Sequence, residues 1–200
     1  MWLYNMLKTM RTLLSKIKKK INYLIKYRLY VNETLLLFKN EKHTNQKSPA
    51  SIAYITPDNV KDVLYFQPPR YIPIFEDFLM RGDTGYFAYL DGNCVHRIWV
   101  VHSSPQIIYL HPMLPRQLKE NEVWIHYVET APHARGRNIF PAVLSKIAED
   151  FDEDGLTLLF AVNEKNTSCI KAALKAGFRE VEKQKVLVLF GIKRTKFFRC

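Results

Sequence analysis

A short basic segment, TAPHARGRNIFPAVL, carries residue types that are well suited to binding a phosphate group. It joins a run typical of a strand, EVWIHYVE, to a run typical of a helix, IFPAVLSKIAEDF. Backbone N–H groups at the start of a helix are unpaired and carry the positive end of its dipole, so they bind phosphate oxygens. Arg135 and Arg137 add positive charge, Gly136 adds flexibility, and Asn138 is a candidate N-cap. We therefore predict a phosphate site at this corner, the alternative being an ordinary basic loop before a capped helix.

The strand before the corner carries two candidates for a general base. Side chains alternate along a regular strand, which predicts two faces: Trp124, His126 and Val128 on one, and Ile125, Tyr127 and Glu129 on the other. The intrinsic pKa of a histidine suits a general base near neutral pH, which makes His126 a candidate, and Glu129 competes with it. The alternative for His126 is a hydrogen-bonded histidine of the sheet.

The elements around these residues predict an α+β domain with a mixed, mostly antiparallel sheet flanked by helices. Asp91-Gly92 between two apolar runs predicts a hairpin. The remaining patterns predict strands at 51–55, 122–129, 156–162 and 185–192, and helical segments starting at Thr56, at 71–80, at 139–151 and at 167–176. We expect three parts: a basic helix, an extended segment and a linker in residues 1–50, the main domain in 51–192, and a basic tail in 193–200.

Two segments of this domain resemble the GCN5-related N-acetyltransferase (GNAT) superfamily. VETAPHARGRNIFPAVL is similar to its pyrophosphate loop and following helix, and AVNEKNTSCIKAALKAGF is similar to its second cofactor-binding segment. The resemblance implies acetyl-CoA as cofactor, a bulge flanked by the backbone of Val128 and Thr130, and Asn166 on the pantetheine arm. It places Lys175 or Lys171 near phosphates, and it assigns the pyrophosphate to Arg135, Gly136, Arg137, Asn138, Ile139 and Phe140.

Three positions depart from the family pattern. Asn138 and Phe140 stand where small residues are usual, and Phe140-Pro141 resembles a bacterial subset with an aromatic-Pro pair there, whose ring would point away from the phosphates. Ala173 occupies the place of the tyrosine that protonates the leaving thiolate, so water, Ser168 or Cys169 would take that role. For Cys169 itself we expect plain packing, because no histidine adjoins it in sequence.

The resemblance implies an acetyl-CoA-dependent N-acetyltransferase for a small amine. Together with the basic N-terminal segment it suggests an amino sugar or a glycan precursor made near a membrane. The alternative is a degenerate member that keeps the fold as a binding or scaffold module.

The first 50 residues hold most of the positive charge of the chain. Eleven Lys and Arg against two acidic residues give them +9 of the total +11. An apolar stripe at helical spacing accompanies the lysines: Leu7, Met10, Leu14, Ile17, Ile21 and Leu24. Residues 7–24 are thus expected to bind an anionic membrane surface or, alternatively, to pack on the domain or in a homodimer. Nucleic acid is not favoured, because Tyr23, Tyr27 and Tyr30 form no obvious stacking platform.

The cysteines and the N-terminal segment indicate the cellular compartment in which the protein is expected. Cys94, Cys169 and Cys200 are an odd number without metal-ligand spacing, which favours a reducing environment. Charged residues interrupt the N-terminal apolar stretch, which argues against a secretory signal. A cytoplasmic protein without a metal site is expected, peripheral on the inner face of the membrane if the helix binds lipid.

Overall fold

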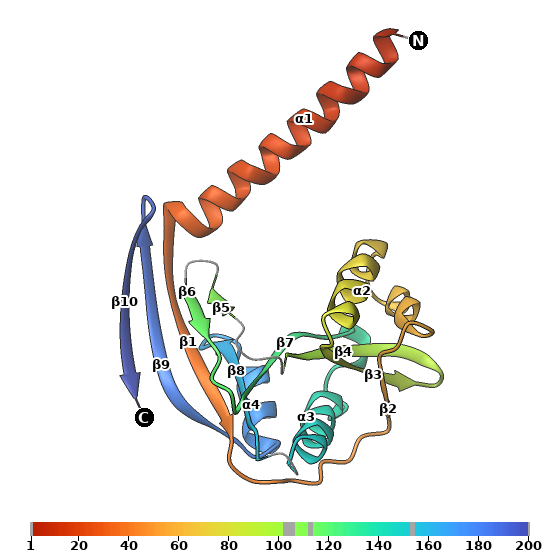
Figure 1. Cartoon of the computed structure of the whole chain (residues 1–200), viewed down its shortest axis with the longest axis vertical. Coiled ribbons are helices and arrows are strands. Elements are labelled where there is room, and N and C mark those ends of the chain that lie inside the picture. The colour runs from red at the N-terminus through yellow and green to blue at the C-terminus, as the bar shows by residue number, and fades with distance from the viewer. Residues whose placement is uncertain (1, 102–106, 112–113, 153–154, 200) are drawn as a thin grey trace.

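The computed structural model describes residues 2–101, 107–111, 114–152 and 155–199. An eight-stranded sheet forms its centre (Figure 1). Neighbouring strands are antiparallel except for β7 and β8, which are parallel, so the predicted α+β class with a mixed, mostly antiparallel sheet is confirmed. The order across the sheet is β10 (Ile192–Arg199), β9 (Phe178–Leu189), β1 (Tyr30–Asn40), β8 (Thr157–Asn163), β7 (Glu122–Thr130), β4 (Asn93–Val101), β3 (Thr84–Leu90) and β2 (Ser51–Tyr54).

Helices cover both faces of this sheet. On one face, α3 (Ile139–Asp150) and α4 (Thr167–Lys175) bury apolar side chains against the strands, among them Val143, Leu144 and Ile147 of α3. On the other face, α2 (Ile72–Met80) and the 3-10 helix Val60–Tyr65 pack around Trp99. A small hairpin of β5 (Ile107–His111) and β6 (Leu114–Gln117) covers Trp124 and Leu159. Short 3-10 turns complete the chain at Pro69–Tyr71 and Pro132–Ala134.

The eight-stranded sheet extends beyond residues 51–192 at both ends. The extended segment assigned to the N-terminal part is β1, which lies inside the sheet between β9 and β8. Its run Leu35, Leu36, Leu37 and Phe38 is buried, as is typical of a strand covered on both faces. The expected basic tail is β10, and the predicted strand 185–192 runs across a turn at Phe190 and Gly191 that joins β9 to β10.

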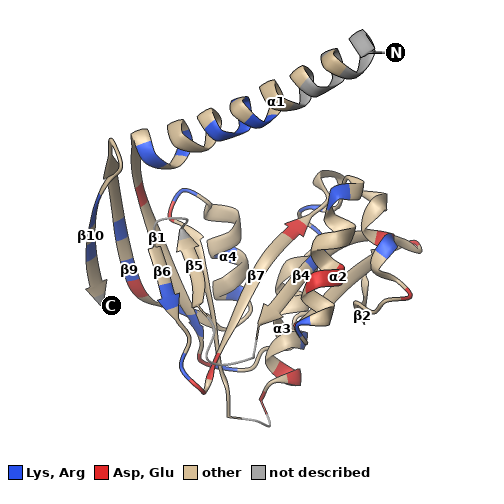
Figure 2. Ribbon diagram, turned by 45° about the horizontal axis from the view of Figure 1, so that its top comes forward, with Lys and Arg blue, Asp and Glu red and all other residues tan. Residues whose placement is uncertain are grey.

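The predicted N-terminal helix is present as α1 (Trp2–Leu24), and a π-helical turn, Ile25–Leu29, joins it to β1. It extends away from the body of the molecule (Figure 1). Lysine and arginine residues lie along α1 and on β9 and β10 (Figure 2). Among the described residues, no helix combines the length and the apolar character needed to cross a membrane.

Candidate active site

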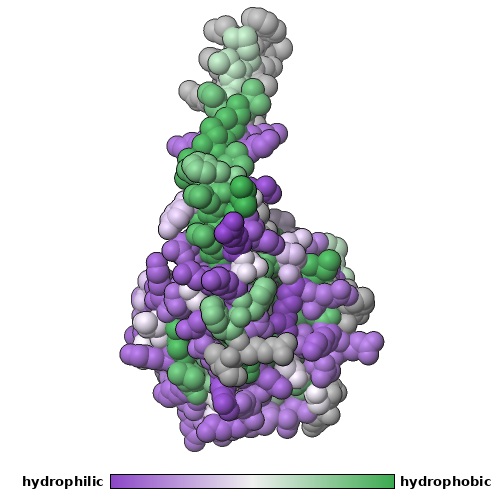
Figure 3. Space-filling view, turned by 90° about the vertical axis from the view of Figure 1, so that its left-hand side faces the viewer, coloured by the Kyte–Doolittle hydropathy of each residue, from purple (hydrophilic) through white to green (hydrophobic). Residues whose placement is uncertain are grey.

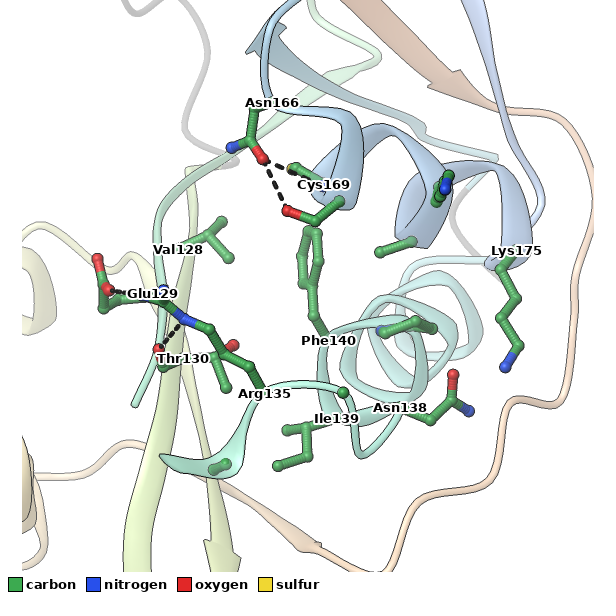
Figure 4. A pocket seen from close by; sticks show the side chains of 16 residues that line it. Val128, Glu129, Thr130, Arg135, Asn138, Ile139, Phe140, Asn166, Cys169 and Lys175 are labelled. Carbon is green, nitrogen blue, oxygen red and sulfur yellow. Dashed lines mark hydrogen bonds and ion pairs between the residues drawn. The ribbon is translucent and has the colours of Figure 1, made fainter. Parts of the chain in front are cut away.

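The candidate site lies where β7 and β8 separate. The two parallel strands pair only from Glu122 to Trp124 on β7 and from Thr157 to Leu159 on β8. Beyond these residues a pocket of about 600 Å³ lies between the end of β7, the start of α3 and helix α4 (Figure 4). All the residues predicted for the site line it except His126 and Arg137: Val128, Glu129, Thr130, Arg135, Gly136, Asn138, Ile139, Phe140, Asn166 and Lys175.

A bulge in β7 shapes one wall of this pocket. Tyr127 has a φ of 52°, and the register with β4 shifts between Arg97 and Trp99. The bulge changes the alternation of side chains, so Tyr127 packs against Phe78, as His126 does, while Val128 packs against the core on the side of α3 and α4. The predicted division of β7 into two regular faces is therefore wrong beyond His126, because a bulge inserts one residue.

Arg97 lies under the bulge and is bonded to it. Its guanidinium donates a hydrogen bond to the carbonyl oxygen of Tyr127 and lies 4.7, 5.4 and 5.3 Å from the ring centroids of Tyr71, Phe75 and Tyr127. Only 4% of Arg97 is exposed, and burial lowers its pKa. A buried cation at this place fixes the carbonyl of Tyr127, and with it the direction of the next amide, that of Val128.

The loop before α3 has the backbone that a phosphate site requires. Gly136 and Asn138 have φ values of 79° and 60°, a region that glycine and asparagine tolerate best. Asn138 occupies the N-cap position but makes no capping bond, which corrects the predicted role of its side chain. Its amide instead donates to the carbonyl oxygen of Lys47 at 2.6 Å, fastening the polar linker beside the pocket. The N–H groups of the first turn, at Ile139 and Phe140, are left without partners inside the helix.

The ring of Phe140 packs toward the core. Its centroid lies 5.9 Å from that of His96 and 6.4 Å from that of Phe160. Phe140 also lines the pocket, and its ring lies between the strand that carries Val128 and helix α4 (Figure 4). A large residue at this position is accommodated because the sheet supplies an aromatic surface for it.

The two arginines of the corner have different surroundings. Arg135 lines the pocket, pairs with Glu129 at 3.2 Å, and donates from Nε to the carbonyl oxygen of Thr130 at 3.2 Å. Arg137 does not line the pocket, and its carbonyl oxygen accepts a hydrogen bond from Ser48 at 3.3 Å. Only Arg135 therefore presents its charge to this space, which corrects the prediction that both arginines do so.

Helix α4 forms the opposite wall. The side-chain oxygen of Asn166 caps the helix by accepting from the amide of Cys169 at 3.2 Å and from the hydroxyl of Ser168 at 3.0 Å. Burial raises the pKa of the Cys169 thiol to about 11, so the thiol is protonated near neutral pH. Ser168, Lys171 and Ala172 also line the pocket, and Ala173 is fully buried behind them.

His126 lies outside the pocket lining. Its ring packs 5.1 Å from that of Phe78, and its Nε2 atom is buried without a hydrogen-bond partner among the described residues. Burial, followed by the charges of Arg81 and Arg97, lowers its pKa to about 4. This corrects the expectation that His126 titrates near neutral pH. His96 on β4 was not predicted; it is fully buried, and its Nδ1 lies 2.7 Å from Oγ1 of Thr130.

Comparisons of the sequence find no relative: no family model matches it, and no curated protein does. The fold does have relatives among solved structures. One is a GNAT-family acetyltransferase from Colwellia psychrerythraea, with a TM-score of 0.59 and 14% identity over 91% of this chain and 61% of that chain. The chain has the GNAT fold. It spans less than two thirds of the length of the Colwellia protein.

Two further solved structures share the fold. One is the glucosamine N-acetyltransferase region of a fungal multi-domain GH3 β-N-acetylglucosaminidase, with a TM-score of 0.56 and 12% identity over 94% of this chain and 23% of that chain. The other is AAC(6')-Iy in complex with the bisubstrate analogue CoA-S-monomethyl-acetylneamine, with a TM-score of 0.51 and 12% identity over 66% of this chain and 91% of that chain. At such identities the likeness establishes the fold alone.

Proposed function

We propose that this protein is an acetyl-CoA-dependent N-acetyltransferase that acts on a small amine. One observation carries the proposal: the bulged end of β7 and the first turn of α3 meet in one pocket of about 600 Å³ at the separation of β7 and β8. A volume of that size suits a cofactor-sized ligand. The pocket also combines helix-start amides with the cationic side chains of Arg135, Lys171 and Lys175, which is the donor set that a pyrophosphate needs.

Each wall of the pocket would have its own task. The amides of Ile139 and Phe140, together with Arg135, would hold the pyrophosphate, and the side chain of Asn166 would bind the pantetheine arm through its free amide group. Acetyl-CoA, when bound, supplies an activated acetyl thioester. The amide of Val128, directed by the bulge, would stabilise negative charge that develops on the thioester oxygen during attack by the amine.

Glu129 is the better of the two predicted bases. Its carboxylate lines the pocket and its side chain is 38% exposed, so an amine can reach it. His126 does not line the pocket, its ring packs on Phe78 and its Nε2 atom is buried, so an amine bound in the pocket does not reach it. We therefore assign proton acceptance to Glu129. Its pairing with Arg135 would also link the acceptor side of the pocket to the phosphate side.

An amino sugar is the acceptor class we favour. The glucosamine acetyltransferase region named above shares the fold, which supports this class by analogy only. A basic amphipathic helix beside the domain would suit an amino sugar or glycan precursor made at an anionic membrane surface, with residues 7–24 as the attachment.

A transfer assay tests this function. The full chain is incubated with acetyl-CoA and a panel of amines that includes glucosamine and amino-sugar phosphates, and both thiol release and acetylated product are measured. The proposal expects amine-dependent thiol release with one added acetyl group on one amine class. Binding of acetyl-CoA without transfer to any amine would instead favour the scaffold alternative.

A further inference from the structure

Helix α1 exposes an apolar stripe along its length. The described members of the stripe are 45–60% exposed: Met10, Leu14, Ile17, Ile21 and Leu24. The side chain of Leu7, the remaining predicted member, is outside the described part of the structure. In Figure 3 apolar side chains run along the face of the projecting helix, with hydrophilic side chains on both sides of it. An apolar face of this length outside the core indicates a surface that binds a partner.

A second apolar element lies at the base of this helix. Leu189, Phe190 and Ile192, at the turn between β9 and β10, are 49%, 75% and 69% exposed. Two backbone hydrogen bonds tie the turn to the end of the helical segment, from Phe190 N–H to the carbonyl of Leu29 at 2.8 Å and from Gly191 N–H to that of Arg28 at 2.6 Å. The turn therefore lies beside the base of the projecting helix that carries the stripe (Figure 1).

The residue at the tip of this turn is unfavourable for folding. Phe190 and Gly191 form a two-residue hairpin loop, and their φ values are 47° and 82°. Such a loop strongly prefers Asn-Gly, because both central residues need a positive φ. Phe190 thus adopts a strained backbone conformation while three quarters of the residue stays exposed to water, so its side chain buries little surface in this chain. An outlier of this kind points to a function for the side chain.

Basic side chains surround both apolar elements. Lys18 and Lys20 flank the stripe at helical spacing, and Lys193 and Arg194 follow the turn on β10; all four are exposed. A second copy of the chain packed on this face would bring these cations together, which disfavours a homodimer seam. Anionic lipid headgroups complement the cations, and the acyl region below them accommodates Phe190 and the stripe.

We propose that α1 and the β9–β10 turn together form one surface that binds an anionic lipid bilayer, with Phe190 inserted below the headgroups. The stripe and the turn are the apolar parts of this surface, and the lysines and arginines at their borders contact the headgroups. The surface is separate from the pocket, so it does not depend on the proposed acetyltransferase activity.

The sharpest test uses the strain at Phe190. The full chain is sedimented with vesicles of phosphatidylcholine mixed with an equal part of phosphatidylserine. Phe190→Asn is expected to weaken vesicle binding roughly tenfold, because it removes one inserted aromatic side chain. The same variant should keep or raise the melting temperature, since Asn-Gly suits the turn. Tyr65→Asn, at an aromatic residue that is 60% exposed on another part of the body, should leave vesicle binding unchanged.

Two further variants separate the apolar and the charged contributions. Leu14→Ser with Ile17→Ser, and Lys18→Gln with Lys20→Gln, should each release the protein from the mixed vesicles. Lys61→Gln with Arg70→Gln, which removes the same charge from the body, should not. Wild-type binding should be lost on pure phosphatidylcholine and weaken at high salt. Vesicle binding that Phe190→Asn does not change would overturn the proposal. So would a wild-type dimer that binds no vesicles and dissociates in the Leu14 and Ile17 variant.

Discussion

Glu129 and His126 are the two candidate bases predicted on β7, and their surroundings differ. Glu129 lies in the pocket, whereas His126 packs against Phe78 with its Nε2 atom buried. We expect Glu129→Gln to lower kcat by about 10²- to 10⁴-fold, because the amide cannot accept the proton. The affinity for acetyl-CoA should stay the same. His126→Gln should leave kcat near that of the wild type. Steady-state kinetics on both variants would contradict this assignment if only His126→Gln lowered kcat.

At the scale of elements, the polar linker between β1 and β2 is packed tightly against the start of β9. The N–H groups of Glu41 and Lys42 donate to the carbonyl of Gly177, and a Cβ atom at Gly177 would overlap the carbonyl oxygen of Lys42. Gly177 also has a φ of 88°. The linker continues to Lys47, which Asn138 holds beside the pocket. Gly177 is therefore expected to be required both for stability and for the position of this linker.

A pair of glycine variants tests that requirement. Gly82→Ala changes a residue with a φ of 80° and open space around it, so it should lower the free energy of unfolding by about 1–2 kcal/mol from backbone strain alone. Gly177→Ala adds the overlap with Lys42, and we expect a loss of about 3 kcal/mol or more. Urea unfolding of both variants measures the difference. Equal losses of unfolding free energy in the two variants would show that the linker shifts away from the added Cβ atom without destabilising the fold.

The same elements show how far the sequence predicts the structure. Periodicity located α2, α3, α4 and the β3–β4 hairpin within a few residues, because each has strong local signals such as Asp91-Gly92. It did not place β1 inside the sheet, because pairing with β8 and β9 is a long-range event with no local marker. The turn at Phe190-Gly191 was missed for a related reason, since phenylalanine is not a turn residue. Of the site, the resemblance to the GNAT motifs named ten residues that line the pocket, whereas the bulge at Tyr127 and its contact with Arg97 required the structure.

At the scale of the whole molecule, two histidines with buried nitrogen atoms predict a loss of stability in acid. Burial lowers the pKa of His96 to about 3 and that of His126 to about 4, below the value of about 6.5 in an unfolded chain. Between these values the unfolded chain binds more protons than the folded chain does. The stability that the two neutral histidines contribute is therefore fully present above about pH 6.5 and declines as the pH falls toward 4. The melting temperature should fall over this range.

Histidine variants attribute this decline. His96→Gln combined with His126→Gln should flatten the dependence of the melting temperature on pH between 6.5 and 4, although it lowers the melting temperature at neutral pH. His133→Gln, at an exposed histidine, should leave the slope as in the wild type. A slope that the double variant does not change would assign the acid sensitivity to other groups.

The central claim, that this corner of the GNAT fold binds acetyl-CoA, is tested most directly by calorimetric titration of acetyl-CoA into three proteins. The wild type should bind. Arg135→Glu should bind at least about tenfold more weakly, because it puts a repelling carboxylate where the pocket presents a cation to phosphate. Arg137→Glu, two residues away with its side chain outside the pocket, should bind like the wild type. The account would be contradicted if the wild type gave no heat of binding, or if both variants lost the same affinity for acetyl-CoA.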